Sequence, residues 1–155
     1  MPVAKLKEFL DKNKIKYVSI RHSTAYTSQE IAASAHVKGR NLAKSVVVKL
    51  DGRMALAVLP AKFQIDLARL REAAGAGDVA LAEEGEFTEK FPACETGAMP
   101  PFGNLYDLAV YVDETLTRDE EIAFNACSHT ELIQIAYADF ERLVKPQLAK
   151  FLVLR

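Results

Sequence analysis

The sequence lacks the features that mark several specialised classes of protein. Its 155 residues include no tryptophan and two cysteines, Cys94 and Cys127, which stand far apart and form no CxxC motif. A disulfide scaffold and a zinc knuckle are therefore not indicated, and we expect reduced cysteines in a cytoplasmic protein. No stretch approaches the roughly 20 apolar residues of a membrane-spanning helix, and the amino end lacks the apolar segment of a signal peptide. We therefore expect no membrane partner.

The chain also lacks an excess of charge of either sign. Twenty Lys and Arg residues stand against 21 Asp and Glu residues, for a formal net charge of -1. Proteins that bind duplex DNA along its backbone usually carry a strong basic excess, so we exclude duplex DNA as a partner. Basic residues gather locally, with five of them from Lys38 to Arg53 against Asp51 alone. Such a stretch is usually a solvated face, and its functional interpretation is a local phosphate-binding edge.

Common catalytic and nucleotide-binding motifs are missing as well. The sequence contains no GxGxxG, Walker loop, HExxH or GxSxG motif. The three histidines, His22, His36 and His129, lie in different segments and do not share the spacing of metal ligands. We therefore expect neither a metal nor another cofactor.

The composition is that of a globular domain. Half of the residues are hydrophobic and 26% are charged, which is ordinary for a folded protein. A chain of this length buries enough surface for a core without cross-links, so we predict a single domain over residues 1–155.

Hydrophobic patterning predicts many strands that follow one another without an intervening helix. Asp51-Gly52 separates two apolar runs and indicates a hairpin, and Pro60 ends its second strand. The predicted strands cover residues 16–21, 45–50, 53–59, 108–112, 121–125 and 132–135. The predicted helices cover the amino end, the segment after the capping box at 27–30, residues 66–74, residues 83–91 and a last segment ending near Pro146. The fold class is therefore α+β, with a mixed, largely antiparallel, curved sheet flanked by helices.

The most unusual local sequence is the loop from Thr96 to Gly103. Gly97 permits a positive φ or the close approach of a ligand, while Pro100 and Pro101 restrict φ and carry no N–H. Such a loop can direct backbone N–H groups at a carbonyl or an oxyanion. The alternative interpretation is a rigid connector between a helix and a strand.

Two further places hold candidate residues. Cys127, Ser128 and His129 follow directly after an apolar strand, where a Cys–His pair could form a thiolate nucleophile; the alternative is a buried cysteine beside a turn. Lys44 precedes the apolar strand at 45–50, and its alternative role is to cover the edge of the core with its aliphatic stem.

Taken together, these residues resemble the YbaK/prolyl-tRNA synthetase-associated domain family. The resemblance rests on Lys44 before a valine-rich hairpin, the GxxxP loop from Gly97 to Pro101 followed by Phe102-Gly103, and the segment from Phe124 to Ile133 that contains His129. It extends from His22 to Val144 in the family's order. The family contains free-standing domains that hydrolyse mischarged aminoacyl-tRNAs and editing domains inserted in bacterial prolyl-tRNA synthetases.

The resemblance implies an activity and a set of site residues. It implies a trans-acting aminoacyl-tRNA deacylase that removes a small amino acid, such as Ala or Cys on tRNA(Pro), with the tRNA 3′ acceptor end as partner and a synthetase as a second candidate partner. Lys44 would contact a phosphate near the terminal adenosine, and the backbone from Gly97 to Pro101 would position the aminoacyl carbonyl. The implied substrate-binding residues are His22, Ala98, Met99, Ser128 and His129.

One departure from the family concerns Cys127, because many relatives have glycine at this position; the accepted amino acid depends on the pocket size there. Two other hypotheses stay open at this point. One is a non-catalytic module of the same fold that binds an aminoacyl-nucleotide or a synthetase. The other is a thiol hydrolase that uses Cys127 and His129.

Overall fold

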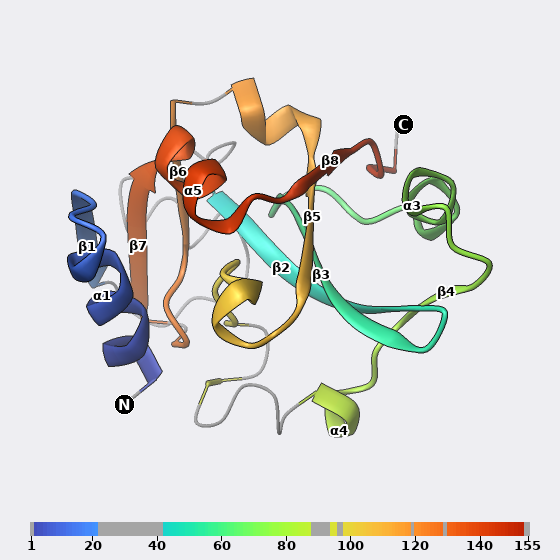
Figure 1. Cartoon of the computed structure of the whole chain (residues 1–155), viewed down its shortest axis with the longest axis horizontal. Coiled ribbons are helices and arrows are strands. Elements are labelled where there is room, and N and C mark those ends of the chain that lie inside the picture. The colour runs from blue at the N-terminus through green and yellow to red at the C-terminus, as the bar shows by residue number, and fades with distance from the viewer. Residues whose placement is uncertain are drawn as a thin grey trace.

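An eight-stranded mixed sheet forms the centre of the molecule (Figure 1). The computed structural model describes residues 2–21, 42–87, 94–95, 98–118, 120–128 and 130–153. The strand order is β1-β7-β6-β2-β3-β5-β8, and β4 pairs with β2. The strands are β1 (Tyr17–Arg21), β2 (Leu42–Leu50), β3 (Arg53–Pro60), β4 (Val79–Leu81), β5 (Ala109–Asp113), β6 (Glu121–Asn125), β7 (Glu131–Ala136) and β8 (Gln147–Ala149).

The sheet confirms the predicted α+β class. Four of the strand pairs are antiparallel, namely β1·β7, β2·β3, β2·β4 and β6·β7. Three are parallel, namely β2·β6, β3·β5 and β5·β8. The short strands β4 and β8 were not predicted, because three residues are too few for an alternating pattern.

The hairpin of β2 and β3 follows from its turn residues. Asp51 has a φ of 51° and Gly52 a φ of 83°, so both central residues have the positive φ that a two-residue type I′ turn requires. Side chains alternate along β3, because Leu56 and Val58 face one core cluster, and Ala55 and Ala57 face another.

Four described helices flank the sheet: α1 (Pro2–Lys12), α3 (Leu67–Ala74), α4 (Glu84–Phe87) and α5 (Tyr137–Val144). Two 3₁₀ helices, η3 (Gly103–Leu105) and η4 (Glu114–Arg118), lie next to β5. The helix α3 is capped at both ends, because the Asp66 side chain accepts a hydrogen bond from the Arg69 N–H and Gly75 takes the left-handed conformation. The predicted helix over 83–91 is described only as α4, and residues 88–93 and the helix predicted after Thr27 lie outside the described residues. No helix in the described ranges is long and apolar enough to cross a membrane.

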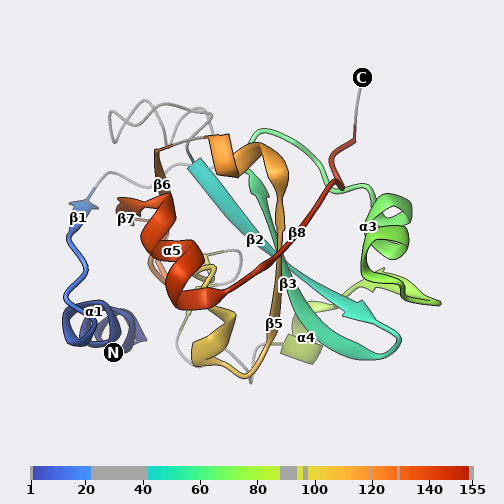
Figure 2. The same cartoon turned by 45° about the horizontal axis from the view of Figure 1, so that its top comes forward.

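The helices cover the two faces of the sheet. Residues of α1 and α5 pack into the larger core cluster, while Leu70 of α3 packs into the cluster on the other face. Figure 2 shows α1 and α5 on one side of the molecule and α3 on the other. In the middle of α1, Lys7 forms an ion pair of 2.8 Å with Glu131 of β7, which also accepts a hydrogen bond from Ser19 of β1.

Phe102 anchors the predicted loop in the larger core cluster. Its side chain is fully buried, and its ring lies 6.0 Å from that of Phe9, 5.5 Å from that of Phe124 and 5.6 Å from that of Phe140. At the next residue the backbone packs closely against that of Leu108, since a Cβ on Gly103 would stand 2.6 Å from the Leu108 carbonyl oxygen. The aromatic cluster therefore determines where the segment before Phe102 leaves the core.

Candidate active site

Lys44 lies in β2 as a half-buried cation. It is paired with Leu59 of β3 across the antiparallel ladder. Burial lowers the pKa of its ammonium group, because water is removed from the charged form. Among the described residues, no carboxylate forms an ion pair with it. A partly desolvated ammonium without a counter-charge favours binding of an external anion.

The other basic residues of the 38–53 stretch do not share this position. Lys49 is five residues along β2 on the opposite face of the strand, and its ammonium group pairs with Glu86 at 2.6 Å. Arg53 begins β3 at the hairpin end. Lys38 and Arg40 lie outside the described residues. In the described part of this stretch, the basic residues therefore do not form a continuous phosphate-binding edge, and Lys44 stands apart from the others.

The described part of the proline loop is joined to the segment after β6 by backbone hydrogen bonds. The Cys127 N–H donates to the Ala98 carbonyl at 2.9 Å, and the Glu95 N–H donates to the Cys127 carbonyl at 3.0 Å. Two segments that the sequence singled out separately are thus held side by side. Both contain predicted site residues.

The loop residues differ in what they can offer to a ligand. Ala98 is fully buried, and its N–H donates to the Glu95 carbonyl. Met99 is 6% exposed, and its side chain packs in the core cluster around Phe102. Its backbone is therefore the part that could contact a ligand. Pro100 and Pro101 are buried and carry no N–H. Within residues 98–101, the Met99 N–H is therefore the backbone donor without a described hydrogen-bond partner.

The Ser128 hydroxyl group takes part in the turn after β6. Its oxygen lies 2.8 Å from the Thr130 hydroxyl and accepts the Thr130 N–H at 3.1 Å, and it lies 3.5 Å from a Glu95 carboxylate oxygen. It therefore stabilises the chain directly after β6. Three predicted site residues, His22, Gly97 and His129, lie outside the described residues.

The prediction of reduced cysteines is wrong, because Cys94 and Cys127 form a disulfide with a Cα–Cα distance of 4.3 Å. Sequence spacing missed this pair, since the two residues are 33 positions apart and meet only when the loop folds against the end of β6. A bonded sulfur is not a thiolate, so this state of Cys127 cannot act as the nucleophile of a thiol hydrolase.

Cys127 also has a φ of 65°, a conformation that glycine adopts without strain. The glycine that the family resemblance implies for this position would adopt the same backbone conformation without strain.

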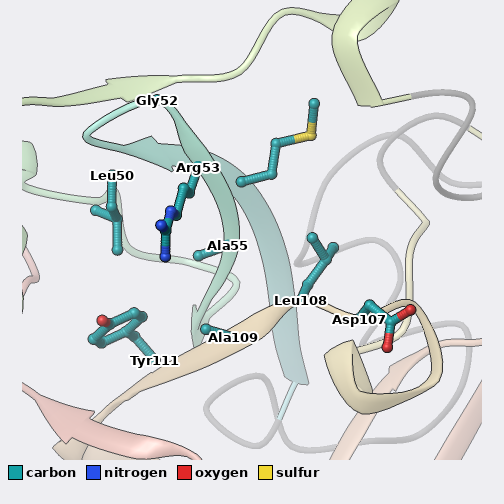
Figure 3. A pocket seen from close by; sticks show the side chains of 9 residues that line it. Leu50, Gly52, Arg53, Ala55, Asp107, Leu108, Ala109 and Tyr111 are labelled. Carbon is teal, nitrogen blue, oxygen red and sulfur yellow. The ribbon is translucent and has the colours of Figure 1, made fainter.

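A described cavity at the other end of β2 is a separate feature. It has a volume of about 630 Å³ and lies beside the hairpin turn, where Arg53 points toward Tyr111 and Asp107 lies apart from them (Figure 3). Six residues of extended strand, or about 20 Å, separate Lys44 from Leu50 at the cavity. Lys44 therefore does not line it.

No group of three His, Cys, Asp or Glu side chains in the described ranges could hold a metal ion.

Asn125, the last residue of β6, lies in the candidate segment that the sequence indicates, but sequence reasoning gave it no role in the site. Its side-chain oxygen is buried without a hydrogen-bond partner among the described residues. A polar residue at the end of an apolar strand was the available signal, but its position relative to Lys44 depends on strand order.

The mixed eight-stranded sheet has the architecture of prolyl-tRNA editing domains. A solved structure described as a candidate trans-editing enzyme for prolyl-tRNA synthetase superposes with a TM-score of 0.84 at 21% identity, over 99% of this chain and 98% of the other. A scaffold protein from the computational grafting of linear epitopes gives a TM-score of 0.83 at 18% identity, over 99% and 98%. These likenesses establish the fold.

The sequence comparisons identify the family within this fold. The model of the aminoacyl-tRNA editing domain matches residues 22–143, and the chain belongs to that family. It is 34% identical over 127 residues to the multifunctional Ser/Thr-tRNA deacylase ProXp-y of Escherichia coli (strain K12), over 77% of this chain and 75% of the relative. It is 28% identical over 142 residues to the prolyl-tRNA editing protein ProX of Acetoanaerobium sticklandii, over 88% and 86%. The predicted family and its hydrolase class, aminoacyl-tRNA deacylase, are thereby confirmed.

Proposed function

We propose that this deacylase acts in trans and hydrolyses the ester of a mischarged tRNA that carries a small amino acid, with Lys44 holding a phosphate of the 3′ acceptor end. The observation that carries this proposal is the half-buried Lys44 ammonium without a described carboxylate partner. A phosphate supplies the missing charge and forms a charge-assisted hydrogen bond there. The near-zero net charge of the chain is compatible with this, because binding one end of an RNA requires few phosphate contacts.

The chemistry requires positioning more than a strong nucleophile. An aminoacyl ester is already activated, so a bound water and a stabilised oxyanion are enough for hydrolysis. In our proposal the Met99 N–H and the backbone at Gly97 bind the developing oxyanion, and Pro101 restricts the loop. His22, Ser128 and His129 border the aminoacyl group, and the fully buried Ala98 supports the loop from behind.

The identity of the amino acid is the finer part of the proposal. The family resemblance implies Ala or Cys on tRNA(Pro), whereas one relative is a Ser/Thr-tRNA deacylase and another a prolyl-tRNA editing protein. The informative panel therefore consists of tRNAs charged with Ala, Cys, Ser, Thr and Pro. We further propose that residues 1–155 work as one domain in the cytoplasm, and that a synthetase supplies tRNA specificity when one is bound.

Lys44→Ala tests the proposal, with Lys49→Ala as the matched control. Both changes remove one lysine from β2, but Lys49 is paired with Glu86 on the other face. We expect Lys44→Ala to lower kcat/KM for the preferred aminoacyl-tRNA by at least about 100-fold, while Lys49→Ala stays within a few-fold of wild type. Thermal unfolding verifies that both variants fold. Equal activity of the two variants would refute the role of Lys44.

A further inference from the structure

The parallel pairing of β2 and β6 places Asn125 beside Lys44. Leu42 is paired with Ala123, and Ala43 with Phe124. The pairing ends there, and Lys44 and Asn125 are the next residues of the two strands, so continuing the register by one residue brings them level at the usual strand spacing of about 4.8 Å. The two residues come from segments 81 positions apart in the sequence, so their proximity depends on this strand order.

The two side chains also share a face of the sheet. Leu42 and Ala123 pack together in a small cluster with Leu132, whereas Ala43 and Phe124 belong to the larger cluster on the opposite face. Because side chains alternate along a strand, Lys44 and Asn125 project to the side of Leu42 and Ala123. The pairing of Asn125 with Leu132 on β7 agrees with this assignment.

The side-chain oxygen of Asn125 is an acceptor without a described donor. It is buried, and no hydrogen-bond partner satisfies it among the described residues. Native structures rarely leave such an atom unpaired, because its lost hydration is not replaced. Ser45 also has a buried, unpaired oxygen, but it alternates with Lys44 and faces the other cluster. On the face of Lys44, Asn125 is therefore the described acceptor that a ligand could satisfy.

The neighbouring cation restricts which donor can bind there. An ammonium group placed beside Lys44 would be repelled, since no described carboxylate offsets either charge. A neutral hydroxyl group can donate without this cost. An aminoacyl-adenosine offers two of them, the ribose hydroxyl next to the ester and, for Ser or Thr, the hydroxyl of the amino acid.

We propose that Asn125 binds the substrate directly, with its side-chain oxygen accepting a hydrogen bond from a substrate hydroxyl group. This inference rests on the proposed function, since Lys44 then holds the phosphate while Asn125 selects and orients the hydroxylated end. Asn125 becomes a specificity-determining residue of the deacylase. Its role is separate from that of the proline loop, which binds the carbonyl.

The test compares wild type and Asn125→Ala on substrates with and without each hydroxyl. The substrates are Ser- and Ala-charged forms of one tRNA, each with a terminal adenosine or a terminal 2′-deoxyadenosine that carries the amino acid on its 3′ oxygen. If the ribose hydroxyl is bound, Asn125→Ala lowers kcat/KM about tenfold on ribose substrates and changes nothing on deoxy substrates. If the amino-acid hydroxyl is bound, the loss of about tenfold occurs on Ser substrates and is absent on Ala substrates.

Two outcomes overturn the inference while the proposed function stands. One is an equal loss on all four substrates, which indicates a structural role or an action through Lys44, and the other is no loss on any of them. Absence of turnover by wild type on the whole panel would overturn both proposals. Asn125→Asp is the second variant if Asn125→Ala unfolds. It keeps the acceptor and the shape but adds a negative charge beside Lys44, so kcat/KM should fall on all four substrates. The preference for the hydroxylated substrate should stay at half of the wild-type value or more, and loss of that preference counts against the inference.

Discussion

At the scale of single residues, the partly buried charge of Lys44 is unfavourable for folding, but the proposed phosphate contact requires it. Burial disfavours its charged form, yet the proposed phosphate contact needs that form. A charge at this position therefore lowers the stability of the fold but serves the proposed function, a trade-off that is common for site residues.

The lowered pKa of Lys44 predicts a pH dependence. The ammonium group loses its proton at a lower pH than an exposed lysine, so the Lys44-dependent part of kcat/KM should fall as the pH rises through that lowered pKa. Lys44→Arg keeps its charge over the same range, and the alkaline fall should disappear in this variant even if its activity is lower throughout. The measurement is the pH profile of kcat/KM, corrected for spontaneous ester hydrolysis. Parallel alkaline limbs in wild type and Lys44→Arg would assign the fall to another group.

At the scale of elements, the position of the loop before η3 depends on Phe102, an apolar residue that takes no part in the proposed chemistry. Phe102 anchors the loop in the aromatic cluster, and Gly103 lets the chain pass the backbone of Leu108. Function in this region therefore rests on packing behind the loop.

Gly103→Ala should destabilise the protein more than a control glycine change. A Cβ there would lie 2.6 Å from the Leu108 carbonyl oxygen and 2.6 Å from a Val110 methyl group, and the backbone contact can be relieved only by a shift of the chain. We expect a loss of about 2–4 kcal/mol in the free energy of unfolding. Gly85→Ala meets nothing within 4 Å and should change it by less than about 1 kcal/mol. Urea denaturation of the two variants compares these costs, and similar midpoints would contradict the close packing at Gly103.

At the scale of the whole molecule, the Cys94–Cys127 disulfide joins two distant segments at the candidate site. Two backbone hydrogen bonds join the same segments independently of the sulfur atoms. The covalent link should therefore add stability, and the local arrangement should survive its loss.

Cys94→Ser should lower the free energy of unfolding by about 2–4 kcal/mol under oxidising conditions, because the bond restricts the unfolded chain. With excess dithiothreitol, wild type and variant should have nearly equal stability. Deacylation by the reduced wild-type protein should remain within a few-fold of that of the oxidised protein. Loss of activity on reduction would show that the disulfide itself holds the site together.

The sequence by itself determined the local features of this protein. The capped helix at 67–74, the Asp51-Gly52 hairpin and the alternating faces of β3 depend on neighbouring residues, so their chemistry can be recognised in a linear pattern. The family resemblance also rests on motifs in their order along the chain, and these motifs indicate Lys44 and the loop from Thr96 to Gly103.

Only the tertiary structure decided which of these features meet. The parallel pairing of β2 with β6 places Asn125 beside Lys44, and the loop against β6 brings Cys94 to Cys127. These contacts join segments tens of residues apart, and their free energy depends on burial and strand order that no local pattern specifies. The sequence therefore determined the local elements and the family, and the tertiary fold determined which residues lie near Lys44.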